Sequence, residues 1–336
     1  MYNRYLVTGA TGFLGRTVVA QLLEKGASVS ALTLENDPLA GSLPQEVHAV
    51  AGNVCDESSL EAFFEGADGG TCVIHCAGIV SVASDPGERI YRVNVGGTRN
   101  ILRKCVAHGV GKLVYVSSVH ALPEKPKGTE ISEKTVIRPG AVKGDYAKSK
   151  AMATVQVLNA AKEGLNASIV FPSGIIGPGD TMNGSITNML RSFLAGKLPL
   201  AIRGGYDFVD VRDVAKGIAD CAESGLPGRG YILSGHYATI RDILETVKKT
   251  VGLRWRVSYL PVALAKLVAP FYEIHSLRKR KPLYFTPYAV AVLDSNGLFS
   301  HRAASETFGY APRSLQSTLH DTVLWLQQNV LTPAAA

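Results

Sequence analysis

The sequence lacks most of the features that mark a secreted, metal-binding or membrane-spanning protein. Its five cysteines among 336 residues are odd in number and scattered, without paired CxxC spacing, so we expect free thiols and no metal site. No apolar run reaches the about 18 residues that span a bilayer. Residues 257–274 come closest but are interrupted by prolines and by Lys266. Because no charged-then-apolar leader opens the chain either, we expect a soluble, cytoplasmic protein without a membrane span.

The charge balance does not indicate a nucleic-acid partner. Lysine and arginine number 35 against 28 acidic residues, a formal net charge of +7, but no long basic run has interleaved aromatic residues. The one dense basic cluster, residues 278–281, is expected to be a solvated loop. With 46% hydrophobic and 19% charged residues the chain can bury a large core. Its length predicts one large fold or two closely packed lobes.

Short apolar, β-branched runs alternate with helical patterns in the first half of the chain. Such alternation predicts an α/β fold in which helices cover both faces of a doubly wound parallel sheet. Strands are expected at residues 4–8, 29–34, 47–51, 72–76, 113–117 and 167–171. Helices are expected at residues 12–25, 57–65, 88–108 and 143–163.

Beyond residue 171 the pattern loosens and predicts a smaller, mainly helical lobe. We expect a Gly/Pro loop at residues 174–180 and a strand at 208–211. Helices are expected at residues 186–195, 240–251, 262–275, 288–293 and 315–330. The predicted division is a dinucleotide-binding Rossmann domain (1–171 plus about 206–236), a substrate-binding lobe (172–205 and 237–330) and a flexible tail (331–336).

Three glycines, Gly9, Gly12 and Gly15, follow the first predicted strand and open the first predicted helix. In this context the first glycine permits a tight turn, the second lets backbone approach a pyrophosphate, and the third lets helix and strand pack closely. The free N–H groups at the start of the helix favour phosphate. The motif therefore predicts a dinucleotide site.

Tyr146 and Lys150 are spaced by one helical turn and so share one face of a predicted helix. A free phenol, with a pKa near ~10, transfers protons poorly at neutral pH. A neighbouring ammonium, joined by the positive charge of an oxidised nicotinamide, stabilises the phenolate and lowers that pKa. The pair therefore predicts interconversion of an alcohol and a carbonyl with a nicotinamide cofactor, in which Tyr146 transfers the proton.

These motifs, in this order, resemble the extended short-chain dehydrogenase/reductase superfamily, which also holds the NAD-dependent epimerases and dehydratases. The GxxGxxG spacing of residues 9–15 has the form found in that superfamily. Similar segments recur over roughly residues 4–325. They lie at residues 52–56, 75–78, 93–98, 115–118, 171–180 and 208–213.

The resemblance implies roles for several of these residues. Ser118 corresponds to the serine that holds the substrate oxygen, with the neighbouring Ser117 as the alternative, and Lys150 would also hydrogen-bond the nicotinamide ribose. Asn94 corresponds to an asparagine that anchors a water in the proton relay, unless its side chain only bends the helix. The implied cofactor-binding residues are Gly9, Thr11, Gly12, Phe13, Leu14, Gly15, Thr33, Asn53, Val54, Cys76, Ala77, Gly78, Tyr146, Lys150, Phe171, Pro172 and Ile175.

The residues after the second strand distinguish NAD from NADP. NAD enzymes of this kind usually place an acid there for the ribose 2′-hydroxyl, whereas NADP enzymes place an arginine nearby. After Thr33 the chain has Glu35 and Asp37 and no cation, and two carboxylates repel a 2′-phosphate. We therefore favour NAD. NADP is the alternative, with Arg16 or Arg103 supplying the missing cation.

The substrate is expected to be uncharged. Nucleotide-sugar relatives commonly carry arginines for the diphosphate, but here Tyr206 and Asp207 precede the Phe208 motif and Phe171 precedes Pro172. With its apolar C-terminal lobe the chain resembles the dihydroflavonol-reductase and 3β-hydroxysteroid-dehydrogenase branch. This implies a hydrophobic carbonyl or alcohol that is steroid-, flavonoid- or lipid-like. The expected pocket residues are His120, Met182, Met189 and Tyr206, although His120 is otherwise a loop residue without a catalytic task.

Two other functions stay open. One is a nucleotide-sugar epimerase or dehydratase that retains its NAD. The other is a non-catalytic dinucleotide-binding regulator, against which the intact set of Ser118, Tyr146 and Lys150 argues. The helices predicted at residues 88–108 and 143–163 resemble those that pair across a two-fold axis in this superfamily, which implies a homodimer.

Overall fold

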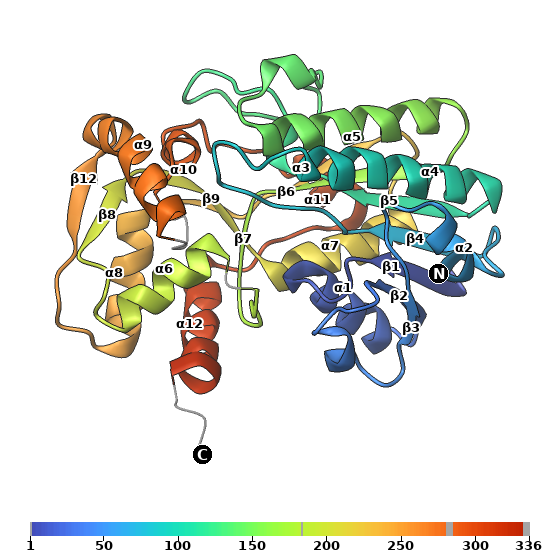
Figure 1. Ribbon diagram of the computed structural model, residues 1–336, viewed down its shortest axis with the longest axis horizontal. Helices are drawn as coiled ribbons and strands as arrows, with labels where there is room; N and C mark the ends of the chain where they lie inside the picture. Colours follow the sequence, from blue (N-terminus) through green and yellow to red (C-terminus); the bar gives the residue numbers. More distant parts are fainter. Residues whose placement is uncertain (1, 183, 280–284, 332–336) are drawn as a thin grey trace.

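A central sheet of seven parallel strands organises the chain, as the computed structural model shows (Figure 1). The structure describes residues 2–182, 184–279 and 285–331. The order of the strands is β10-β6-β5-β4-β1-β2-β3. Their bounds are Arg4–Thr8 (β1), Ser28–Thr33 (β2), His48–Ala51 (β3), Thr71–His75 (β4), Lys112–Val116 (β5), Ala167–Pro172 (β6) and Gly230–Leu233 (β10). The order reverses between β1 and β4, and ligands of open parallel sheets bind outside the carboxyl ends of the strands at such a point.

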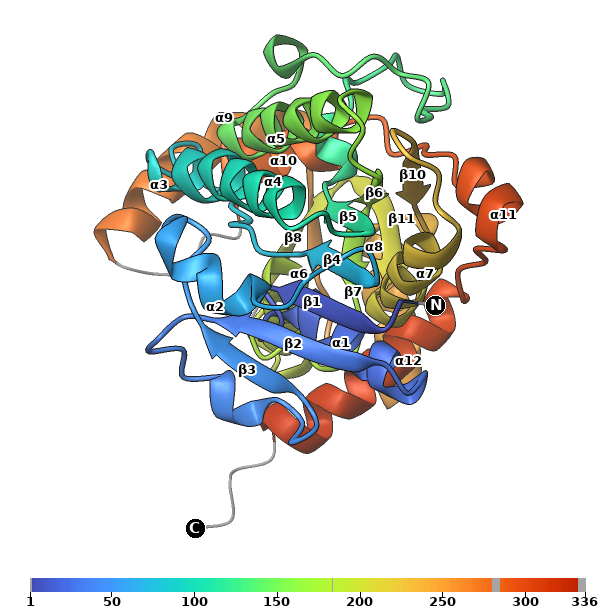
Figure 2. The same cartoon turned by 90° about the vertical axis from the view of Figure 1, so that its right-hand side faces the viewer.

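Helices cover both faces of this sheet, which confirms the predicted doubly wound fold (Figure 2). On one face α1 (Phe13–Glu24), α7 (Val211–Ser224) and α11 (Arg302–Phe308) pack on a core that includes Val18 and Ile218. On the other lie α2 (Glu61–Phe64), α4 (Thr98–Ala107) and α5 (Asp145–Lys162). Strands β4, β5 and β6 are buried along their whole length because both of their faces are covered.

The helix predicted at residues 88–108 is divided into three parts. A short α3 (Arg89–Tyr91) continues into a π-helical segment, Arg92–Gly97, and then into α4. Gly97 allows this segment to pack tightly, because a Cβ there would lie 2.8 Å from the side chain of Val54. Such π-helical turns occur frequently at functional sites. The other unexpected break is at residues 57–65, which form a 3₁₀ turn, Ser58–Leu60, followed by α2.

Two small sheets build part of the C-terminal lobe, and the sequence predicted only one of their strands. The first has the order β11-β9-β7, with bounds His236–Thr239, Gly205–Asp210 and Gly174–Ile176. The second pairs β8 (Leu200–Arg203) with β12 (Ser258–Pro261). The prediction of a loop over residues 174–180 was therefore wrong at its start. Strands of three or four residues bounded by glycine or proline are too short to show a clear alternation of apolar and polar positions.

The rest of the lobe is helical, as predicted. Its helices are α6 (Ser185–Leu194), α8 (Ile240–Val251), α9 (Val262–Arg278), α10 (Pro287–Leu293) and α12 (Leu315–Leu326), with a π-helical end at Gln327–Leu331. Helix α8 starts with a reciprocal capping box between Thr239 and Asp242 and ends at Gly252 in the left-handed conformation. Most of the predicted tail, residues 332–336, and the residues Arg280 and Lys281 of the basic cluster lie outside the described residues.

The next observations concern cysteines, metal sites and membrane spans in the described part of the chain. There the five cysteines are free thiols, and no group of three or more His, Cys, Asp or Glu side chains is arranged to hold a metal ion. No helix within residues 2–182, 184–279 and 285–331 has both the length and the apolar content to cross a membrane.

Candidate active site

The glycine loop after β1 is closed by contacts that only glycines permit. Gly9 has a φ of +69°, and a Cβ there would lie 2.7 Å from the amide nitrogen of Ala77. A Cβ at Gly15 would overlap the carbonyl oxygen of Gly9. The amide of Gly12 donates to this same oxygen at 3.1 Å. The three glycines therefore hold the start of α1 against the carboxyl ends of β1 and β4.

The start of α1 is suited to a phosphate. Gly12 is its N-cap and contributes no side-chain cap, so backbone N–H groups of the first turn, which includes Phe13 and Leu14, are available to an anion. The Thr11 hydroxyl donates to Asp37 at 2.7 Å and thereby joins the glycine loop to the loop after β2. Since Asp37 follows Thr33 at the end of β2, the predicted pyrophosphate and adenosine-ribose segments lie together.

The segment after β4 connects the glycine loop to α5. Ala77 packs on Gly9, and a Cβ at the next residue, Gly78, would lie 3.2 Å from both Asn94 Oδ1 and Lys150 Nζ. Gly78 therefore lets the loop pass close to Asn94 and Lys150. Cys76 precedes this segment, and burial raises the pKa of its thiol to about 12, so it is not a nucleophile.

Asn53 and Val54 occupy the turn after β3. The Asn53 side chain accepts from the Cys55 amide at 2.9 Å, and the carbonyl of Val54 accepts from Asn100 at 2.9 Å. Both bonds hold the turn in place at the same edge of the sheet as the glycine loop. A turn fixed in this way can present its backbone to an adenine ring.

Tyr146 and Lys150 lie on α5 and are both buried. Lys150 donates to the carbonyl of Val116 at 2.8 Å, and its ammonium is 5.2 Å from the ring centre of Tyr115. Burial lowers the pKa of Lys150 to about 8. In the protein without a cofactor, burial raises the pKa of Tyr146, and the neighbouring Ser118 acts in the opposite direction.

The structure distinguishes the two adjacent serines after β5. The Ser117 hydroxyl is 2.7 Å from that of Thr154 on α5, inside the core. Ser118 instead lies near enough to Tyr146 to lower the pKa of its phenol, and its hydroxyl accepts from the His120 amide at 3.2 Å. Of the two serines, Ser118 is therefore the one on the side of the phenol.

Asn94 lies in the π-helical segment and binds the loop after β4. Its Oδ1 accepts from the Ile79 amide at 2.7 Å, and its Nδ2 donates to the Ile79 carbonyl at 3.0 Å and to the Ser149 hydroxyl at 2.9 Å. The side chain thus joins the loop to α5. This positioning role was not among the two that the sequence suggested.

Aromatic rings surround the phenol of Tyr146. His120 stacks on Tyr206 with ring centres 5.5 Å apart and lies 5.9 Å from the ring of Tyr146. Its two ring nitrogens face the hydroxyls of Tyr206 at 3.3 Å and Tyr288 at 3.4 Å. Burial lowers the pKa of His120 to about 4, so the imidazole is neutral at physiological pH. Tyr288, from α10, was missed by the sequence analysis because nothing near it in the chain marks it as part of a site.

Several predicted site residues contribute to packing. Phe171 is buried in β6. Its ring occupies the space that a side chain at position 230, a glycine, would need. Pro172 ends the same strand, and Ile175 packs against the core from β7. In the lobe, Met189 is half-buried on α6, whereas Met182 is 58% exposed. The structure brings Tyr206 and His120, but not Met182, into the aromatic surroundings of Tyr146.

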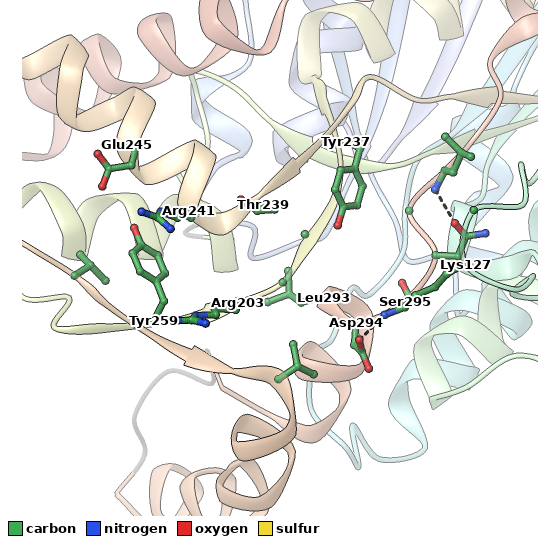
Figure 3. A pocket seen from close by; sticks show the side chains of 18 of the residues that line it. Lys127, Arg203, Tyr237, Thr239, Arg241, Glu245, Tyr259, Leu293, Asp294 and Ser295 are labelled. Carbon is green, nitrogen blue, oxygen red and sulfur yellow. Dashed lines mark hydrogen bonds and ion pairs between the residues drawn. The ribbon is translucent and has the colours of Figure 1, made fainter.

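A separate cavity of about 960 Å³ lies in the C-terminal lobe (Figure 3). Gly205 lines it, whereas the next residue of β9, Tyr206, stacks on His120, and no predicted catalytic residue contributes to it. Two carboxylates, Glu245 and Asp294, face the cavity. Its cationic lining residues are Lys127, Arg203, Arg241, Lys248 and Arg256.

Together, a glycine loop at the switch point of a parallel sheet and a buried Tyr-Lys pair beside a serine define a nicotinamide-dependent oxidoreductase of the short-chain dehydrogenase/reductase type. The chain belongs to the NAD dependent epimerase/dehydratase family, whose model matches residues 5–233. NAD is the cofactor of this family, as the sequence predicted.

Similar proteins cover nearly the whole chain. Sterol demethylase protein B of Methylococcus capsulatus is 28% identical over 96% of this chain and 98% of its own. A putative dihydroflavonol 4-reductase of Synechocystis is 29% identical over 98% of this chain and 96% of its own. The crystal structure of gox2253 is 29% identical, with a TM-score of 0.84 over 98% of this chain and 99% of that one. These similarities confirm the predicted branch of the superfamily.

Proposed function

We propose that the protein interconverts a hydroxyl and a carbonyl group on a hydrophobic, steroid-, flavonoid- or lipid-like molecule, with Tyr146 as the general acid and base. The observation that carries this proposal is the position of Tyr146. Its phenol lies near Ser118, which lowers its pKa, and beside the ring of His120, which contacts the rings of Tyr206 and Tyr288. Rings with neutral polar tips suit an uncharged substrate that has one oxygen to bind.

The chain's own residues supply binding, orientation and the proton. The hydride would be supplied by the reduced nicotinamide cofactor, or taken up by the oxidised one, when it is bound beside Tyr146 and Lys150. In the reductive direction Ser118 and Tyr146 donate hydrogen bonds to the carbonyl oxygen, and Tyr146 then gives up its proton to that oxygen. Lys150, still mostly protonated at neutral pH with its pKa of about 8, stabilises the phenolate that this leaves. Oxidation of the alcohol is the reverse, with Tyr146 as the base.

The relatives support the class of substrate. One is named for sterol demethylation and another for reduction of a dihydroflavonol, and both names describe polycyclic, uncharged molecules. The test is a panel of steroid and flavonoid ketones and alcohols, with turnover of each compound measured as a change in cofactor absorbance. We expect net turnover with a hydrophobic pair and none with UDP-sugars. Saturable turnover of a UDP-sugar, without a net change in NAD, would overturn the proposal in favour of an epimerase or dehydratase.

The cationic cavity is the observation that favours the second candidate, a nucleotide-sugar epimerase or dehydratase. Buried diphosphates need fixed cations, and Arg203, Arg241 and Arg256 offer them although the expected arginines before Phe208 and Pro172 are missing. Titration with UDP-glucose separates the candidates. Binding that is abolished by Arg203→Gln or Arg241→Gln would favour the epimerase.

We expect NAD to bind more tightly than NADP, by roughly fivefold or more, because Glu35 and Asp37 follow β2 and repel a 2′-phosphate. Dissociation constants for both cofactors, measured on one preparation, test this. The control is Arg16→Gln: the Arg16 guanidinium donates to Ser42 at 3.0 Å, while its buried Nε has no partner. A preference for NADP that this substitution removes would identify Arg16 as the phosphate ligand. Arg103 already pairs with Glu57 at 3.0 Å.

We also propose a homodimer formed through α4 and α5. The two helices lie side by side on the outer face of the sheet (Figure 2), and they expose Val106 and Met152. Light scattering at micromolar concentration should give twice the mass of the chain. A monomer mass there, or a dimer that persists after Val106→Glu and Met152→Glu together, would contradict this interface.

A further inference from the structure

Helix α9 presents its large apolar side chains outward. Six of them, at helical spacing along one face, are between 48% and 71% exposed: Leu264, Leu267, Val268, Phe271, Ile274 and Leu277. The face that packs on the lobe consists instead of Ala265, Ala269, Glu273 and Ser276. A helix of a soluble domain normally has the opposite arrangement, and contiguous exposed apolar patches usually mark an interaction site. The 17 residues of α9 make the helix roughly 25 Å long, and we call the row of exposed side chains from Leu264 to Leu277 the ridge.

Basic residues flank the ridge. Arg278 and Lys279 are exposed at its carboxyl end, and Arg280 and Lys281 follow in the sequence. Lys266, near the start of the helix, has a side chain that is 55% exposed and pairs with Asp294 at 2.6 Å. The one acidic residue of α9, Glu273, is buried and accepts two hydrogen bonds from Ser84. The exposed surface of α9 is therefore apolar and cationic, without a carboxylate.

The ridge lies at the outer edge of the lobe, and contacts connect it to the catalytic residues (Figure 1). Glu273 holds Ser84 in the loop that follows Gly78. Helix α10, which packs on α9, brings Tyr288 to His120. The loop between Gly78 and Ser84 also exposes Val80. The hydrogen bonds of Glu273 thus connect α9 to the segment beside the proposed cofactor site.

We propose that α9 docks the protein on the surface of an anionic lipid bilayer. The helix lies in the plane of the interface, with its leucines and Phe271 in the acyl boundary and Arg278 and Lys279 on the phosphates. Such partition requires an apolar face together with basic residues, and both are present. Docking also places the loop of residues 78–84 near the bilayer, in which a hydrophobic substrate dissolves. Only this link to the substrate rests on the proposed function.

A second copy of the chain fits the ridge less well. A symmetric contact between two α9 helices needs carboxylates to meet the exposed cations, and the only acid on the helix is buried. A single helix face of six apolar side chains is also small beside the surface that a stable dimer buries. A lipid surface supplies anionic groups at any register and has no such requirement.

The experiment is co-sedimentation of the full chain with vesicles. We expect binding to mixed phosphatidylcholine and phosphatidylglycerol vesicles, with weaker binding to phosphatidylcholine alone and at high salt. The variant Leu267→Gln/Phe271→Gln/Ile274→Gln should partition roughly 100-fold less, because it removes three side chains that enter the acyl boundary. Arg278→Gln/Lys279→Gln should partition roughly tenfold less.

A control variant removes three exposed apolar side chains elsewhere on the molecule. The variant Val136→Gln/Leu226→Gln/Leu324→Gln alters three exposed side chains on other elements and should bind vesicles like the parent. Affinity for NAD, measured on every variant, reports the fold independently of any substrate. Unchanged vesicle binding by the α9 variants overturns the proposal. So does a variant that lowers the mass in light scattering without affecting vesicles, since the ridge would then be a contact between copies.

Discussion

Tyr146→Phe is expected to lower turnover about 10²- to 10⁴-fold while cofactor binding and the fold are retained. The substitution deletes one hydroxyl, the group that lies near Ser118 and that we propose donates the proton. The buried ring keeps its packing, so the free energy of unfolding should change little. Steady-state rates with a hydrophobic ketone, together with the dissociation constant for NAD, measure both parts of this prediction.

Tyr91→Phe is the matched control. It deletes the same group from a half-buried tyrosine whose hydroxyl donates to Asp145 at 2.8 Å, at the start of the same helix α5. Because Tyr91 is outside the proposed proton path, turnover should stay within a few-fold of the parent. Near-normal activity of the Tyr146 variant would end the assignment of Tyr146 as the acid. Equal losses in both variants would indicate that disturbance of α5 is responsible instead.

Gly15→Ala is expected to weaken NAD binding about 100-fold. A Cβ at this position overlaps the carbonyl oxygen of Gly9, so the glycine loop must move away from α1. A displacement of about 1 Å in a positioning element can cost on the order of 100-fold. Titration of NAD, followed by fluorescence or calorimetry, gives the change directly.

Gly41→Ala is the control for this change, since a Cβ there meets no atom within 4 Å. It should bind NAD like the parent. Thermal unfolding of both variants distinguishes a displaced loop from a destabilised domain: we expect the melting temperature of Gly15→Ala to fall modestly while binding is largely lost. If the variant binds NAD normally, the dinucleotide does not rest on this loop.

The elements that the sequence predicted well are those whose signal is local. Strands such as β4 and β5 are continuous apolar runs because both of their faces are covered, and α1 and α5 have a helical period over several turns. The short strands β7, β8, β11 and β12 were missed, because three or four residues between glycines and prolines carry no such period. Strand β10 was missed for the same reason, although it completes the central sheet.

The candidate site shows the same division. The spacing of Tyr146 and Lys150 and the glycines of the loop could be identified from the sequence, because one helical turn and one tight turn bring each set together. The preference for Ser118 over Ser117 depends on which of the two side chains faces Thr154. That depends on how α5 packs against the end of β5, which the local sequence does not show. Tyr288 reaches His120 from a helix near the other end of the chain.

By itself the sequence determined a doubly wound parallel sheet, a dinucleotide loop and a Tyr-Lys pair, since each follows from spacing within one or two elements. Only the tertiary structure decided that Tyr146 is buried, which raises the pKa of its phenol in the protein without a cofactor. It also decided that α9 turns its apolar residues outward. The sequence of an apolar helix does not show which of its residues will be exposed, because burial depends on how the whole chain packs around it.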